Sequence, residues 1–258
     1  MKRDDNMELY KRDLWLNPNI LFAFNKSITE YDIKEAGFSL TREFELLPKK
    51  KIESLMKLSK DARKRALGVI QRDNAEYKEQ LKKAFKEARR VFMETNELDE
   101  SNIISIKKDA IFSTSLCNST EFGEIKFVPK NVYSCYMRFP NGKEVYYSKN
   151  KIDVKGIDDD VWHVHDNYII NFISTVCEMY MSESKSELLR FIRRFVDKYK
   201  KMILPLGYYR EFNERSKYIL KDETSNTVFD EYWDDKIDEL DIGYNYFNVI
   251  IPLLKMVV

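Results

Sequence analysis

Residues 102–112 read NIISIKKDAIF, which is an apolar run, a short charged turn and a second apolar run. Branched and aromatic side chains favour strands, so this stretch predicts a β-hairpin with Lys107, Lys108 and Asp109 at its tip. A carboxylate at such a tip is exposed, yet the strands beneath it fix its position. That geometry suits a metal-binding carboxylate, and it equally suits an ordinary turn residue.

A helical region precedes the hairpin, and a strand region follows it. Apolar residues recur at spacings of three and four over residues 49–98, with a break near Asp73-Asn74, while Lys and Arg fill the other face. Further strands are predicted at 124–128, 131–139 and 143–148, with a turn at Pro140-Asn141-Gly142, and further helices at 168–181 and 186–203. Helices, then an antiparallel sheet, then helices is an α+β order and not an alternating βαβ order.

Composition excludes several classes of protein. The chain has seven glycines in 258 residues and no GxGxxG or GxxxxGK[ST], which argues against a Rossmann site or a P-loop. The formal net charge of +1 gives nucleic-acid binding no support, so any basic surface must be local. Three scattered cysteines and the lack of an apolar run of about 18 residues predict a soluble, cytoplasmic protein without disulfides. Richness in Lys, Asn, Ile, Tyr and Phe suggests an AT-rich genome, viral or low-GC bacterial.

Asp32 and Asp109 are the candidate pair for catalysis. Two-metal phosphoryl transfer needs carboxylates from separate elements, with the metal ions about 3.5–4 Å apart. Asp32 stands where an extended segment gives way to a helix, and Asp109 stands at the hairpin tip. The alternative is that Asp32, in the pattern D-x-x-E with Glu35, is a helix N-cap and that Asp109 is a turn acid.

Five features in order give a resemblance to family B DNA polymerases over residues 28–204. Residues 30–40, EYDIKEAGFSL, are similar to motif A of that family, D-x-x-S-L-Y-P-S, and residues 105–112, SIKKDAIF, fall where motif C reads Y-x-D-T-D-S-I-F. Residues 85–98 resemble the helix that leads into motif C. Residues 128–147 and the segment IDVKGI at 152–157 look like the K-x-Y region and the D-V-K-G-I segment that follows it.

The resemblance implies an α+β fold: a polymerase-like palm, an antiparallel sheet with packed helices, with short helical fingers and a helical thumb. The implied division is an N-terminal segment at 1–27, a palm at 28–160 with fingers at about 49–98, and a thumb-like region at 161–258. Asp32 and Asp109 would hold Mg²⁺ and be catalytic. Nucleic acid or substrate would be bound by Lys64, Arg65, Gln71, Arg72, Lys107, Lys108 and Lys155.

Several positions depart from the family pattern. Lys107 stands in place of the first Asp of D-T-D, and motif A lacks its Tyr unless Phe38 substitutes for it. The fingers motif K-x-x-x-N-S-x-Y-G has no counterpart, and no exonuclease domain precedes motif A. His163 and His165 form an H-x-H without a third ligand nearby, so surface histidines, or histidines with satisfied hydrogen bonds, are the default interpretation.

Three hypotheses follow. The first is a minimal template-dependent nucleotidyltransferase, phage-encoded and acting in the host cytoplasm on DNA or a primer-template. The second is a catalytically inactive palm subunit that binds nucleic acid, a separate polymerase or a replisome subunit; Lys107 favours it, because an ammonium group can occupy the place of a metal. The third is a phage structural or host-interaction protein. No membrane partner is expected.

Overall fold

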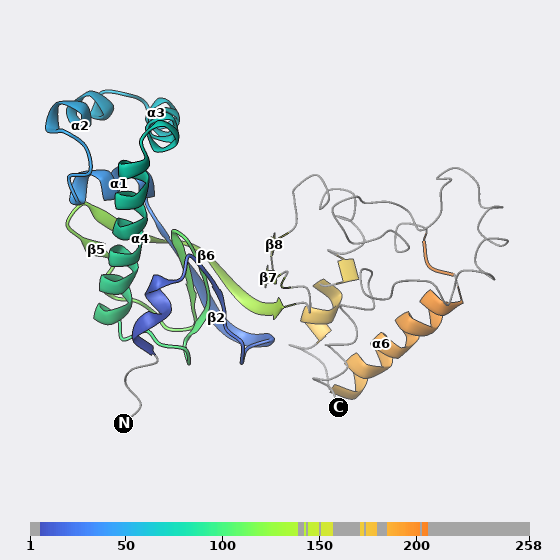
Figure 1. The fold of residues 1–258 in the computed structure, drawn as a ribbon. Coiled ribbons are helices and arrows are strands. Elements are labelled where there is room, and N and C mark those ends of the chain that lie inside the picture. Colours follow the sequence, from blue (N-terminus) through green and yellow to red (C-terminus); the bar gives the residue numbers. More distant parts are fainter. Residues whose placement is uncertain are drawn as a thin grey trace. The chain divides into compact units, whose positions relative to one another are not determined.

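The computed structural model describes residues 6–138, 142, 144–149, 151–156, 171–172, 174–179, 185–201 and 203–205. The chain divides into two compact units (Figure 1). The first comprises Met1–Ile20 and Lys26–Tyr133, and the second comprises Leu21–Asn25 and Ser134–Val258. Two long strands, β2 and β6, contribute residues to both units.

The first unit contains an antiparallel sheet in the order β1-β3-β4-β2-β6, with β5 paired to β6. The strands are β1 (Leu14–Leu16), β2 (Phe22–Ile33), β3 (Ile103–Lys107), β4 (Ala110–Ser113), β5 (Glu121–Phe122) and β6 (Ile125–Arg138). β3 and β4 form the predicted hairpin, in which Lys107 pairs with Ala110 and Lys108 and Asp109 make the turn. Buried isoleucines on both strands explain why this segment is extended and central in the sheet.

The described residues of the first unit form five helical segments: η1 (Asn6–Lys11), α1 (Ala36–Glu43), α2 (Lys49–Met56), α3 (Lys60–Asp73) and α4 (Ala75–Thr95). The predicted break near Asp73-Asn74 is confirmed. There Asn74 ends α3, and its side chain accepts a hydrogen bond from the Tyr77 backbone N–H at the start of α4. Ser59 caps α3 in the same way.

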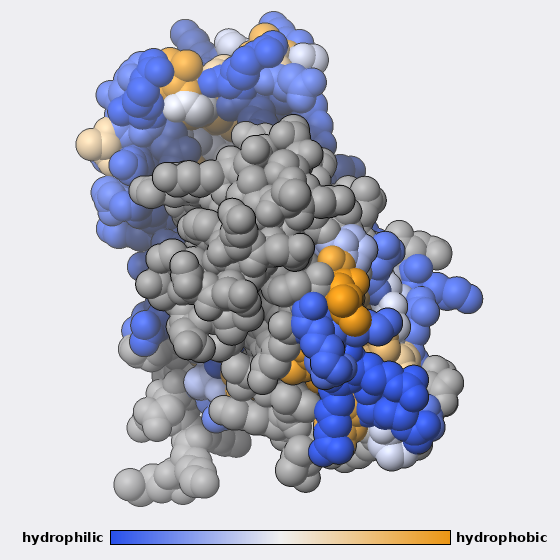
Figure 2. Space-filling view, turned by 90° about the vertical axis from the view of Figure 1, so that its right-hand side faces the viewer, coloured by the Kyte–Doolittle hydropathy of each residue, from blue (hydrophilic) through white to orange (hydrophobic). Residues whose placement is uncertain are grey.

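The core of the first unit lies between α4 and the sheet. The ring of Phe92 on α4 stacks on Phe127 of β6, with ring centroids 4.1 Å apart, and also contacts Tyr31 of β2. Leu55 of α2 and Leu67 of α3 are buried in the same cluster. The surface of α2 and α3, at the top of Figure 2, is mainly hydrophilic; Met56 of α2, Val69 of α3 and Leu58 between the two helices are the exposed apolar exceptions.

In the second unit, the end of β6 pairs with β7 (Glu144–Ser148), and β7 pairs with β8 (Lys151–Lys155). Glu144 is buried there and accepts hydrogen bonds from the hydroxyls of Tyr136 and Tyr146. Residues 171–172 and 174–179 are helical, and α6 (Lys185–Lys200) follows. α6 buries Leu188, Ile192 and Phe195, and the Phe195 ring packs on Phe172.

The predicted polymerase-like palm with separate fingers and thumb is wrong. The sheet continues through β6 into β7 and β8, so it is one extended antiparallel sheet, and its two longest strands run through both units. The segment expected to form fingers is also not a separate lobe, because Leu55 and Leu67 join the core of α4 and the sheet. The apolar faces of α2 and α3 bury more surface in this shared core than they could in a small lobe of their own. The shared arrangement is therefore the more stable one.

Several predictions concern residues that the structure does not describe. Four of them lie outside the described residues: the Pro140-Asn141 part of the predicted turn, both histidines of the H-x-H pattern, the boundary between residues 160 and 161, and most of the predicted thumb. Among the described cysteines, which are Cys117, Cys135 and Cys177, all are buried and none forms a disulfide.

Candidate functional site

Asp32 of strand β2 and Asp109 of the β3–β4 turn come together in the first unit. Asp32 lies near the end of β2 and is paired with Ala110 of β4, and the Ile33 backbone N–H donates to the Asp109 carbonyl at 3.0 Å. Both residues line one pocket with a volume of about 420 Å³. The interpretation of Asp32 as a helix N-cap is wrong, because α1 begins at Ala36 and its N-cap is Glu35, in the left-handed conformation with φ 49°.

The two carboxylates influence each other electrostatically. The pKa of Asp109 is raised, first by burial and second by the negative charge of Asp32. Lys108 and Lys130 oppose that rise only in part. A pair of carboxylates that repel each other in a half-buried pocket is a place where a cation is bound favourably.

The pocket has a basic rim and an apolar floor. Lys60 and Lys64 of α3 stand on the rim, both exposed, and neither forms an ion pair within the described part of the chain. Arg63, by contrast, already has an ion-pair partner: it pairs with Glu35 at 2.7 Å and lies over the Phe38 ring, 4.3 Å from its centroid. The floor is formed by Phe38, Leu67, Tyr77, Leu81 and Phe85. Such a combination accommodates a ligand with a charged end and a flat or apolar part.

The predicted binding residues divide into three groups. Lys64, Gln71 and Lys108 line the pocket, and the Lys108 ammonium lies over the Phe85 ring at 5.0 Å. The residues that do not line it are Arg65, Arg72 and Lys107; Arg72 is exposed and pairs with Asp73 at 2.9 Å. Lys155 ends β8 in the second unit.

Arg89 is a residue that the sequence analysis missed. It is fully buried on α4, and its guanidinium donates to the Tyr10 carbonyl and to Asp13, each at 2.8 Å, and to the Lys108 carbonyl. The turn that carries Asp109 is therefore fixed from below by a charged group with three acceptors. The signal was an arginine inside the apolar stripe of the helix, four residues after Phe85 and three before Phe92.

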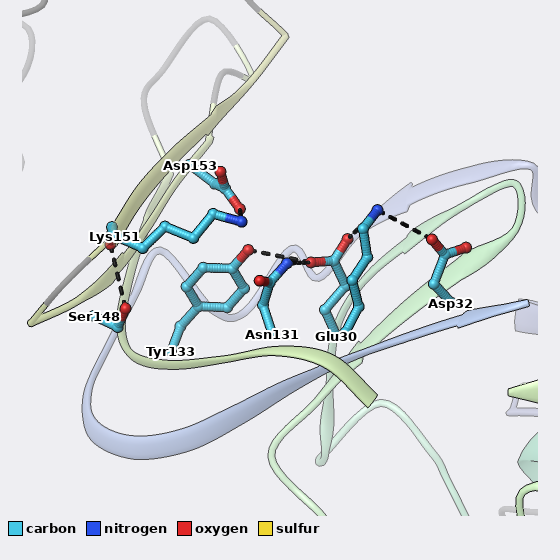
Figure 3. Close-up of polar contacts among 8 residues, drawn as sticks. Glu30, Asp32, Asn131, Tyr133, Ser148, Lys151 and Asp153 are labelled. Carbon is cyan, nitrogen blue, oxygen red and sulfur yellow. Dashed lines mark hydrogen bonds and ion pairs between the residues drawn. The ribbon is translucent and has the colours of Figure 1, made fainter. Parts of the chain in front are cut away.

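A second missed group lies beside Asp32 (Figure 3). Lys130 of β6 places its ammonium nitrogen 3.1 Å from Asp32 Oδ2 and 3.7 Å from Glu30 Oε1. Glu30 is almost wholly buried and also accepts hydrogen bonds from the Asn131 amide and the Tyr133 hydroxyl. The signal for Glu30 was its position two residues before Asp32 in a strand, which puts both side chains on one face.

The donor set determines which cations could fit. Within the described residues there is no group of three or more His, Cys, Asp or Glu side chains able to hold a metal. Mg²⁺ does not need one, because proteins commonly bind it through one or two carboxylates, with phosphate and water oxygens completing the shell. Asp32 and Asp109 match that pattern, whereas a structural zinc site would need a fuller set of protein ligands.

Comparison with known proteins defines the class first: this is a protein of a bacteriophage family. The chain belongs to the family of the Bacteriophage PBS1 gene 130 protein, whose family model matches residues 5–258. No curated protein matches the chain. The predicted phage origin is confirmed, while nothing in the comparison supports a family B polymerase. In the part of the chain that the structure describes, no helix is both long and apolar enough to cross a membrane.

Proposed function

We propose that this phage protein binds the phosphates of a nucleotide or nucleic acid in the pocket of the first unit, together with a divalent cation held by Asp32 and Asp109. The observation that carries the proposal is that these two carboxylates, one from strand β2 and one from the β3–β4 turn, line the same pocket beside a rim of lysines. Mg²⁺ is the cation that this oxygen donor set favours. Lys60, Lys64 and Lys108 would neutralise phosphate charge around it.

Binding is tested with a fluorescent nucleoside triphosphate and with a short single-stranded DNA, each titrated with and without Mg²⁺. Asp109→Asn should weaken the Mg²⁺-dependent part of binding at least about tenfold, because it removes one of two anionic ligands. Asp61→Asn is the matched control: this exposed aspartate lies in the first turn of α3 and does not line the pocket. Equal loss in both variants, or binding without any dependence on Mg²⁺, would refute the proposal.

The lysine rim has its own test. Replacing Lys60 and Lys64 together with Gln should weaken binding and reduce the dependence of log K on log salt by about 1.4, the value for two phosphate contacts to a single strand. Lys57→Gln is the control, because Lys57 is exposed next to α2 and does not line the pocket. An unchanged salt dependence would remove the rim from the proposed site.

Nucleotidyl transfer is a second candidate function, favoured by the same pair of carboxylates. In that reaction a hydroxyl oxygen attacks the α-phosphorus and its proton passes to solvent, while the bond from that phosphorus to the bridging oxygen breaks and pyrophosphate leaves. Primer extension on DNA and RNA templates with Mg²⁺ or Mn²⁺ tests it, beside Asp109→Asn. Extension that this variant abolishes would show transfer, while template binding without extension would exclude transfer and leave a binding role.

A further inference from the structure

Lys130 occupies the place beside Asp32 where a bound cation would be expected. Its ammonium nitrogen lies 3.1 Å from Asp32 Oδ2, and Asp32 is only about a quarter exposed, at 24%. The pKa of Lys130 is raised, above all by its hydrogen bond to Asp32. From the sequence, Lys107 is the residue expected to replace a metal. Neither Lys107 nor Lys130 is among the residues that line the pocket, but the Lys130 ammonium contacts the candidate ligand Asp32 directly.

Lys130 also has a second acceptor within reach. Glu30 Oε1 lies 3.7 Å from the same nitrogen, and the Glu30 side chain is 4% exposed. Asn131 and Tyr133 both donate to the other oxygen of Glu30, so one oxygen is held by neutral donors while the other faces the lysine. A buried carboxylate needs a counter-charge, and Lys130 is the cation that the structure places next to it.

We propose that Lys130 is an exchangeable counter-ion, which neutralises Asp32 when the pocket holds no divalent cation and transfers to Glu30 when one binds. This inference rests on the proposed cation site at Asp32 and Asp109. Without the lysine, Glu30 and Asp32 would lose the cation that lies near both of them, and Asp32 would still face the charge of Asp109. With it, Asp32 has a counter-charge within the protein itself, and a divalent cation must compete with that partly exposed ammonium group.

Such competition makes the site selective for a cation that arrives with its ligand. A hydrated divalent ion alone gains two carboxylates but must displace the lysine. A cation bound to phosphates also gains the contacts of the lysine rim, which offset that displacement. The protein would therefore bind the free divalent ion weakly and the cation–phosphate complex much more tightly.

The test measures direct binding of Mn²⁺ to the full-length protein by the electron paramagnetic resonance signal of free Mn²⁺. Lys130→Met should bind Mn²⁺ about fivefold more tightly than the unmodified protein, the factor expected when an exposed ion pair no longer competes. Lys126→Met is the matched control: Lys126 is a similarly exposed lysine of β6, which pairs with Glu121 at 2.9 Å. It should leave Mn²⁺ affinity unchanged.

Glu30→Gln tests the second position of the lysine. In the protein that retains Lys130, this substitution should weaken Mn²⁺ binding. Lys130 then has no second carboxylate to move to, so it competes more strongly for Asp32. In the Lys130→Met background the same substitution should have a much smaller effect, and this double-mutant cycle isolates the exchange. Thermal unfolding of each variant shows whether Glu30→Gln, a substitution at a buried position, leaves the protein folded. The test with Lys130→Met is at an exposed position and remains valid even if Glu30→Gln unfolds the protein.

The possible results distinguish a failure of the lysine exchange from a failure of the proposed cation site at Asp32 and Asp109. Mn²⁺ binding that Asp109→Asn abolishes and Lys130→Met leaves unchanged would overturn the exchange while supporting the cation site. Absence of Mn²⁺ binding from both the unmodified protein and Lys130→Met would overturn the cation site, and the exchange with it. Tighter binding in Lys130→Met and not in Lys126→Met is the result that the inference requires.

Discussion

Asp109 shows how one residue can be placed at a cost to stability. Burial and the charge of Asp32 raise its pKa, so ionisation of this carboxyl is less favourable in the folded protein than in the unfolded chain. Below the ordinary pKa both states are protonated and the cost is absent. Above the raised pKa of the folded state both are ionised, and the full cost is present.

Asp109→Asn should therefore stabilise the protein at neutral pH, by on the order of 1 kcal/mol, the usual size of a single-residue effect. The gain should decline as the pH falls and vanish near about pH 3, below the ordinary pKa of aspartate. Urea denaturation of both proteins at several pH values measures it. Equal stability of the two at neutral pH would show that the carboxylate carries no penalty.

Replacing Arg89, whose guanidinium is buried, should instead destabilise the protein. Arg89→Lys removes the fork that reaches Tyr10, Asp13 and Lys108 together, and should cost about 3 kcal/mol of unfolding free energy. Arg90→Lys, at the neighbouring, partly exposed position that pairs with Glu87 and Glu94, should cost less than about 0.5 kcal/mol. Urea denaturation of the pair decides it, and similar losses in both would contradict the anchoring role.

At this scale the sequence indicated part of the site. Asp32, Asp109, Lys64, Gln71 and Lys108 were proposed from a resemblance, and the structure brings them to one pocket. Lys130 was not proposed, because it lies 98 positions after its partner Asp32 and nothing local in the sequence links the two. Pairing across a sheet is set by the whole core and not by neighbouring residues.

Among the elements, the junction of α3 and α4 has the clearest local cause. Asn74 is in an extended conformation, ends one helix and begins the next, and its side chain accepts from the Tyr77 N–H at 2.9 Å. The helix it starts is the longest in the first unit and carries much of the core.

Asn74→Ala should therefore cost about 1 kcal/mol of stability, through the loss of one N-cap. Ser59→Ala is a graded comparison, because the cap bond at α3 is longer, 3.4 Å, and should contribute less. Urea denaturation of the two variants tests the order. A larger loss at Ser59 would contradict the assignment of the main cap to Asn74.

Elements were the level at which sequence reasoning succeeded best. The β3–β4 hairpin, the helical region and its break followed from periodicity and turn residues, which act locally. Two expected strands, 124–128 and 131–139, proved to be one strand, β6, that continues through Pro129. Pro129 is a local signal for an interruption there, but β6 continues through it as the neighbour of β2 in the sheet.

Over the whole molecule, the two units share β2 and β6. The cysteines report on the units separately, because Cys117 belongs to the first and Cys135 and Cys177 belong to the second. All three thiols are buried, and burial raises the pKa of Cys117 to about 11, which slows its reaction further.

Iodoacetamide labelling along a urea series, read by peptide mass spectrometry, should show all three cysteines protected in the native protein and exposed over one range of urea concentration. The reason is that loss of either shared strand disrupts both units at once. Labelling of Cys135 and Cys177 at clearly lower urea than Cys117 would show that the units unfold independently.

The architecture of the whole molecule was the level at which the resemblance failed. Short motif-like segments carried it, and they reflect local strand–turn–helix geometry that many folds contain. The apolar faces of α2 and α3 determined instead that these helices join the common core.

The anchoring by Arg89 has a consequence for the protein as it is being synthesised. Arg89 links the hairpin tip to Tyr10 and Asp13, which stand 79 and 76 positions earlier in the chain. Those N-terminal residues leave the ribosome long before α4 and the β3–β4 hairpin do. Until then Tyr10 and Asp13 cannot accept hydrogen bonds from Arg89. Translation of the first third of the chain therefore yields no ligand pocket, and the nascent protein acquires its candidate site only after the hairpin has emerged.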